Sequence, residues 1–173
     1  MNNTIRLYGL VAESIVDGPG YRTAVFTQGC PHRCEGCHNP ESHSPDGGTV
    51  WALDDVENQF ASNPMLDGIT LTGGEPFMQP AECAQLARRA HARNLSVWTY
   101  TGYTLEQLNA MAAEDAAVRA LLEETDVLID GPFLLGERSL TLQFRGSRNQ
   151  RVIDMKLTRA RGTAVLWNAG EWR

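Results

Sequence analysis

The amino-acid sequence has few cysteines, no long apolar run and no excess of positive charge. Its 173 residues include 15 Lys and Arg against 21 Asp and Glu, a formal net charge of -6. A chain with this charge balance is not expected to present the broad basic surface that binds nucleic acid or anionic membranes. No transmembrane helix or signal peptide is evident either. These absences favour a cytoplasmic protein that binds neither nucleic acid nor membrane.

The rest of the composition is that of an ordinary globular protein. Hydrophobic residues make up 42% of the chain and charged residues 21%, which excludes a disordered tail, a collagen-like repeat and a coiled coil. The length suits one unit with a full hydrophobic core. Residues 1–173 are therefore expected to form a single domain.

The scarce cysteines are unevenly placed. Three of the four, Cys30, Cys34 and Cys37, lie within eight residues, and Cys83 is far from them. Such close spacings rarely allow an unstrained disulfide, and three clustered thiols cannot all pair. Cys83 falls on an apolar stripe with helical spacing, where a free cysteine usually acts as a small buried hydrophobe. The pattern predicts a reducing compartment and a metal-binding loop.

The spacing C-x3-C-x2-C leaves two kinds of metal centre open. Structural zinc takes four ligands, and His32, His38 or His43 could supply the fourth. Ordinary ferredoxin clusters use four cysteines, so three thiolates on a four-iron cluster would leave one iron open to chemistry. The spacing favours the cluster, and a non-catalytic zinc or iron–sulfur binding module is the alternative.

Apolar patterns along the chain predict alternating strands and helices. The expected strands cover residues 21–28, 69–72, 95–101 and 127–129, with weaker candidates at 152–155 and 164–167. The expected helices cover residues 54–62, 80–93 and 104–124. Such alternation is typical of βαβ units around a mainly parallel sheet. Since a closed eight-unit barrel needs about 250 residues, the expected fold class is α/β, with an open, partial β/α barrel.

Polar or glycine-rich loops follow four of the expected strands. The cysteine loop follows the first strand, and residues 73–76 (Gly-Gly-Glu-Pro) follow the second. Residues 99–102 and 130–132 end the third and fourth strands. Because chemistry in parallel α/β sheets gathers at the carboxyl ends of the strands, these loops are expected to meet at one edge.

The cysteine loop and the Gly-Gly-Glu-Pro loop together resemble the radical S-adenosylmethionine superfamily. Residues 17–22 (Asp-Gly-Pro-Gly-Tyr-Arg) are similar to the glycyl-radical-enzyme activases within it. Residues 98–103, 126–133 and 145–154 are similar to a narrower group, the activating proteins of the anaerobic ribonucleoside-triphosphate reductase. The resemblance covers about residues 5–157 of the chain.

This resemblance implies two cofactors. Cys30, Cys34 and Cys37 would bind three irons of a [4Fe-4S] cluster, and S-adenosylmethionine would chelate the fourth. The glycines would let backbone carbonyls approach the methionine ammonium, and Glu75 would offer it a charged acceptor. The expected cofactor-binding residues are Gly36, Cys37, His38, Gly73, Gly74, Glu75, Thr99 and Asp130. Many relatives carry an aromatic residue where this chain has Gly36, so adenine needs other contacts.

The reaction implied by the resemblance begins when the reduced cluster passes one electron to S-adenosylmethionine. The S–C5′ bond breaks, and methionine and a 5′-deoxyadenosyl radical result. This radical takes a hydrogen atom from a glycine α-carbon of the partner, the glycyl-radical reductase subunit. The cluster and cofactor are expected to carry the chemistry, and the electron to come from a flavodoxin- or ferredoxin-type donor. The alternative within the superfamily is an activase or small-molecule enzyme with a different partner.

Three further groups of residues allow two interpretations each. Asp17, with Thr99 and Asp130, could form a polar or monovalent-cation site beside the cofactor or could cap turns. Arg145, Arg148 and Arg151 could dock the reductase or could belong to a solvated loop. Trp167 and Trp172 could pack in the core or form a contact surface.

Overall fold

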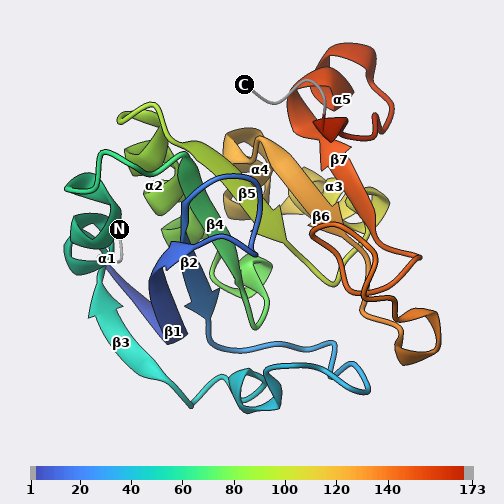
Figure 1. Ribbon diagram of the computed structural model, residues 1–173, viewed down its shortest axis with the longest axis horizontal. Coiled ribbons are helices and arrows are strands. Elements are labelled where there is room, and N and C mark those ends of the chain that lie inside the picture. Colours follow the sequence, from blue (N-terminus) through green and yellow to red (C-terminus); the bar gives the residue numbers. More distant parts are fainter. Residues whose placement is uncertain (1–2, 170–173) are drawn as a thin grey trace.

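The computed structural model describes residues 3–169, and its centre is one seven-stranded sheet (Figure 1). The strands are β1 (Thr4–Ser14), β2 (Arg22–Thr27), β3 (Thr49–Ala52), β4 (Gly68–Gly73), β5 (Ser96–Tyr100), β6 (Val127–Asp130) and β7 (Arg151–Asp154). Their order across the sheet is β3-β1-β2-β4-β5-β6-β7. The four central strands β2, β4, β5 and β6 run parallel, and the outer strands pair antiparallel. The α/β class with a mainly parallel centre is confirmed, and the sheet is open.

Helices cover one face of this sheet, behind the strands in Figure 1. They are α1 (Leu53–Ala61), α2 (Pro80–His91), α3 (Leu105–Glu114) and α4 (Ala116–Glu124), while α5 (Met155–Arg161) follows β7. Short 3-10 turns occur at η1 (Pro40–Ser42), η2 (Pro76–Met78) and η3 (Leu135–Glu137). None of the helices in residues 3–169 is both long and apolar enough to cross a membrane.

Alternation along the strands decides which side chains meet the helices. Ile69 and Leu71 of β4 and Val97 of β5 join the main core with α1 to α4. Trp98 lies on the opposite face, where its ring packs edge-on against Phe144 and Trp167 at centroid distances of 5.3 and 5.0 Å. Trp167 therefore contributes to packing in this structure.

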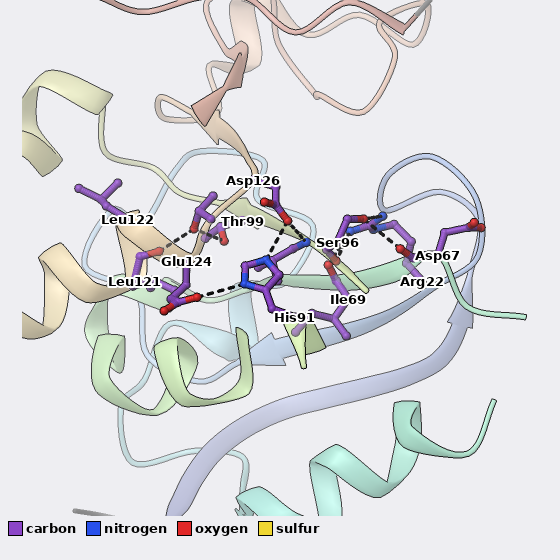
Figure 2. Close-up of polar contacts among 12 residues, drawn as sticks. Arg22, Asp67, Ile69, His91, Ser96, Thr99, Leu121, Leu122, Glu124 and Asp126 are labelled. Atoms are coloured by element: carbon purple, nitrogen blue, oxygen red, sulfur yellow. Dashed lines mark hydrogen bonds and ion pairs between the residues drawn. The ribbon is translucent and has the colours of Figure 1, made fainter. Parts of the chain in front are cut away.

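A buried arginine, Arg22, lies on the face of the sheet opposite the helices. The Arg22 guanidinium donates to the carbonyl oxygens of Ile69 (2.7 Å) and Ser96 (2.9 Å) (Figure 2). It also lies over the Trp98 ring. Burial lowers the pKa of Arg22 to about 10. A Cβ at Gly18 would lie 2.7 Å from the Arg22 side chain. Within the motif at residues 17–22, the loop that precedes β2 therefore packs against the Arg22 side chain.

The structure contains two strands that the sequence patterns do not predict, β1 and β3. In β1, buried Ile5 and Leu7 alternate with Arg6 and Tyr8, a period of two that marks a half-buried strand. The antiparallel pairing of β1 with β2 and β3 extends the sheet beyond its parallel units. Antiparallel neighbours such as β1 and β2 need no crossover helix between them.

Two other boundaries differ from the predicted pattern. The single helix expected over residues 104–124 is two helices, because the Asp115 carboxylate accepts from the backbone N–H groups of Ala117 and Val118 and caps α4. Residues 164–167 form no strand, although Leu166 makes one bridge to Ile153. Trp172 lies outside the described residues.

Candidate functional site

A pocket of about 160 Å³ lies at the carboxyl ends of the four parallel strands. The thiols of Cys30, Cys34 and Cys37 line it from the loop after β2. The ends of β4, β5 and β6 and the loops after them contribute Thr72, Gly73, Gly74, Tyr100, Thr101, Gly102, Gly131 and Phe133. The expectation that four loops meet at one edge of the sheet is confirmed.

Backbone hydrogen bonds hold the cysteine loop in place. The Gly29 N–H donates to the Ser42 carbonyl (2.8 Å), and the Cys30 N–H donates to the His43 carbonyl (3.1 Å). Inside the loop, the Cys37 N–H donates to the Cys34 carbonyl (3.1 Å). These bonds draw residues 29–43 into a compact loop that turns its cysteines to the pocket.

Backbone N–H groups also point at two of the sulfur atoms. Burial raises the pKa of the Cys30 thiol, while hydrogen bonds from the backbone of His32 and Arg33 oppose that shift. The Asn39 N–H donates to Cys37 Sγ at 3.4 Å. Such donors stabilise thiolates, the form that binds metal, and tune the potential of iron–sulfur clusters.

The three clustered cysteines and Cys83 differ in their surroundings. Within residues 3–169, no three His, Cys, Asp or Glu side chains gather closely enough to hold one metal ion. Thiolates that bind different irons do not need to meet at one point, so this arrangement is compatible with a cluster. Cys83 lies fully buried on α2 in the main core, and burial strongly raises the pKa of its thiol. Of the four cysteines, Cys30, Cys34 and Cys37 line the pocket and Cys83 does not.

The histidines considered as zinc ligands have different surroundings. His32 Nε2 lies 2.7 Å from a carboxylate oxygen of Glu75. The exposed His38 ring lies 6.0 Å from the Phe133 ring. His43 lines the pocket, and its Nε2 is buried without a hydrogen-bond partner among residues 3–169.

Close backbone contacts require glycine at the last residue of β4, Gly73, and at the next residue, Gly74. Gly73 has φ +96°, and a Cβ there would lie 2.5 Å from Phe26 Cα. A Cβ at Gly74 would lie 2.4 Å from the Gly29 carbonyl oxygen. The Gly74 N–H donates to the Thr27 carbonyl at 2.8 Å. The turn therefore packs directly against the backbone that leads into the cysteine loop.

Glu75 is fully buried and joins three of the loops. Its Oε1 accepts from the Phe77 N–H (3.0 Å), and its Oε2 accepts from the Gly102 N–H (2.9 Å). The Thr101 hydroxyl lies 3.0 Å from both oxygens. His32 completes the set of partners. These contacts tie the turn after β4 to the loops after β2 and β5.

The structure does not bring Thr99 and Asp130 to the pocket. Thr99 is buried on the helix side of the sheet, where its hydroxyl bonds that of Thr125 at the end of α4 (Figure 2). Asp130 is also buried and accepts from the Leu105 N–H (2.8 Å) at the start of α3 and from Arg151. Asp17 lies on the other face, where its carbonyl accepts from Thr70. The three residues do not form a common polar or cation site, because Thr99 and Asp130 face the helices, whereas Asp17 lies in the loop before β2 on the other side of the sheet.

Gly36 lies beside the pocket with a positive φ of 75°. A Cβ there would lie 3.0 Å from a Leu135 methyl group and 3.5 Å from the Phe133 ring. Phe133 lines the pocket as well. An aromatic ring is thus present beside this position, but it comes from the loop after β6.

The three arginines near the end of the chain do not act together. The Arg151 guanidinium pairs with Asp130 and Glu106, and these carboxylates raise its pKa. Arg145 donates to the Gln150 carbonyl, and Arg148 is exposed. Arg151 therefore has a structural role in joining β7 to α3.

Comparison with known proteins agrees with this site. Residues 16–153 match the model of a 4Fe-4S single cluster domain. An anaerobic ribonucleoside-triphosphate reductase-activating protein from Haemophilus influenzae is 34% identical over 154 residues, which cover 83% of this chain and 94% of that protein. The chain belongs to this family of reductase-activating proteins. Family members from Escherichia coli K12 and Enterobacteria phage T4 are each 32% identical, over 80% and 79% of this chain and 91% and 86% of their own lengths.

The sequence placed Thr101 and Gly102 in a loop at this edge of the sheet, but it did not identify them, or Tyr103, as site residues. Thr101, Gly102 and Tyr103 surround Glu75 and His32, yet the sequence pattern drew attention to Thr99 instead. The sequence signal that could have identified these residues was the end of the apolar strand at residue 100. Loop residues beyond a strand reach the pocket, whereas Thr99 is still inside β5.

Proposed function

We propose that this protein activates an anaerobic ribonucleoside-triphosphate reductase by installing a glycyl radical on it. The main support is one pocket that combines three cysteines with the Gly73–Gly74 turn, in a chain that matches activating proteins over most of its length. When bound, a [4Fe-4S] cluster and S-adenosylmethionine supply one-electron chemistry that removes a hydrogen atom from a glycine of the partner. The fold we propose is the partial β/α barrel of radical S-adenosylmethionine enzymes.

The residues of the pocket have separate roles in this proposal. Cys30, Cys34 and Cys37 bind three irons, and backbone N–H groups face the sulfur atoms of Cys30 and Cys37. Gly73 and Gly74 have no side chains, so their backbone lies open to the methionine part of the cofactor.

The opposite wall of the pocket is proposed to hold the adenine part. Gly36 and His38 lie next to Phe133 there, and this apolar ring also helps to exclude water. Thr99 and Asp130 are not among the proposed cofactor-binding residues, because both side chains are buried on the face of the sheet that the helices cover. The reducing electron is proposed to come from a flavodoxin- or ferredoxin-type protein.

The test uses the complete protein purified without oxygen. The expected content is about four irons per chain, and incubation with reductant, S-adenosylmethionine and the reductase should give a glycyl-radical EPR signal. If the cluster is intact and the cofactor is cleaved but no such signal forms, the reductase is not the substrate. Colourless protein with one zinc would support the metal-binding module instead.

A further inference from the structure

All acceptor positions of the Glu75 carboxylate are occupied by groups of the protein. An ionised carboxylate accepts about four hydrogen bonds. Four groups point at this one: the N–H groups of Phe77 and Gly102, the Thr101 hydroxyl and His32 Nε2. The carboxylate is also fully buried. Glu75 therefore has no free position from which to accept from a cofactor ammonium group.

His32 acts as a donor in this network. An ionised carboxylate has no hydrogen to donate, so we assign the hydrogen of this contact to Nε2 of His32. The 2.7 Å distance between Nε2 and the carboxylate oxygen is the shortest of the four contacts. A charge-assisted bond of this kind is about twice as strong as one between neutral groups.

The His32 ring lies in a closely fitting slot. The Tyr103 ring meets it edge-on, with 4.4 Å between centroids and 74° between planes. A Cβ at Gly102 would lie 2.3 Å from His32 Cδ2, so only glycine leaves room for the imidazole. The ring is 15% exposed. The loop after β5 thus fixes the orientation of His32 as well as that of Glu75.

This contact joins the two parts of the pocket. His32 stands between Cys30 and Cys34, and Glu75 directly follows Gly74. The Glu75 N–H already donates to the Gly29 carbonyl (2.8 Å) at the base of the cysteine loop. The side-chain contact adds a second attachment farther along that loop. Together they determine the position of the thiols relative to the glycine turn.

We propose that His32 is a positioning residue, which holds the cysteine loop against the Gly73–Gly74 turn so that S-adenosylmethionine can bind both. The inference rests on the proposed function, because it assumes that this cofactor occupies the pocket. It also assigns Glu75 a different role from direct contact with the ammonium group. The buried carboxylate anchors His32 and the loop after β5.

The experiment compares four full-length proteins reconstituted with iron and sulfide under anaerobic conditions. They are the native chain, His32→Ala, His32→Gln and His91→Ala. Glutamine keeps an N–H donor that can reach Glu75, whereas alanine has none. His91 is the matched control, because it also pairs with carboxylates, Glu124 and Asp126, but belongs to α2 outside the pocket. Iron content, S-adenosylmethionine affinity and the change in the EPR spectrum of the reduced cluster on cofactor addition are measured.

His32→Ala should bind S-adenosylmethionine about 10–100-fold more weakly, the usual effect of losing a partner that orients metal ligands. Its EPR spectrum should change only at correspondingly higher cofactor concentrations. His32→Gln should recover most of the affinity, and His91→Ala should match the native protein. If alanine abolishes cluster binding, retention of iron in the glutamine variant supports the same conclusion.

Two results would overturn the inference. One is native affinity and native EPR response in His32→Ala. The other is equal impairment of the alanine and glutamine variants, since the donated hydrogen bond would then not be the property that matters. These measurements need no reductase. A native protein that binds the cofactor normally but forms no glycyl radical would contradict the proposed function and not this inference.

Discussion

Replacing Asp130 with asparagine should destabilise the protein without weakening cofactor binding. The Asp130 carboxylate is 1% exposed and accepts from the Leu105 N–H at 2.8 Å and from two nitrogens of Arg151. Asparagine carries no charge and presents an amide N–H₂ group to these donors. The change therefore breaks a buried ion pair and leaves the first turn of α3 without a full acceptor.

The size of the effect follows from how far the two partners are buried. Removing one member of a fully buried pair costs about 3–5 kcal/mol. Arg151 is 34% exposed and keeps its contact with Glu106, so the expected loss is somewhat smaller, about 2–4 kcal/mol. For a chain of this size, such a loss lowers the unfolding temperature by roughly 5–15 °C.

Urea and thermal unfolding followed by far-UV circular dichroism measure the stability, and anaerobic titration of the reconstituted protein measures S-adenosylmethionine affinity. Glu106→Gln is the matched control, because it removes the exposed carboxylate from the same arginine and should cost less than about 1 kcal/mol. A variant Asp130→Asn with native stability and weakened cofactor binding would refute the structural role and restore Asp130 to the cofactor site.

Three further predictions concern the cysteines, the glycine turn and one titrating histidine. Cys34→Ala should lose iron from the purified protein, whereas Cys83→Ala should keep it, because Cys83 is buried in the core. Gly74→Ala should cost about 1–3 kcal/mol in urea unfolding and reduce the iron content, since the new Cβ would lie 2.4 Å from the Gly29 carbonyl oxygen. Hydrogen bonds to its carboxylate partners, Asp126 foremost, raise the pKa of His91 above 6.5. Its contribution to stability is therefore complete below pH 6.5 and is lost as the pH rises through the raised pKa.

Each of these predictions has a result that contradicts it. Full iron content in Cys34→Ala would remove this cysteine from the ligand set. Native stability and iron content in Gly74→Ala would mean that the loop shifts freely. The His91 effect should stay below about 1 kcal/mol, since the side chain is partly exposed, and it should disappear in His91→Gln. An unchanged pH profile of urea unfolding in that variant would assign the titration to another group.

Local sequence patterns predicted much of the fold because each depends on neighbouring residues. The helical spacing around Cys83 placed α2, and the helix expected from residue 104 begins where α3 does, at the capping box that Thr104 and Gln107 form in the structure. The break at Asp115 was missed, because an apolar periodicity continues through it. Strand β1 was missed for a different reason. The alternation of Ile5 and Leu7 with Arg6 and Tyr8 is a local strand signal, but it does not show that β1 pairs with β2 and β3.

By itself, the sequence determined the metal-binding loop, the glycine turn and the order in which loops follow strands. Close spacing along the chain places Cys30, Cys34 and Cys37 in one loop wherever that loop lies. Tertiary structure alone decided that Thr99 faces the helices and that Glu75 meets His32, 43 residues away. The physical reason is that a strand presents alternate residues to opposite faces, and only packing decides which face the helices cover. A buried carboxylate likewise takes its partners from whichever loops the fold brings to it.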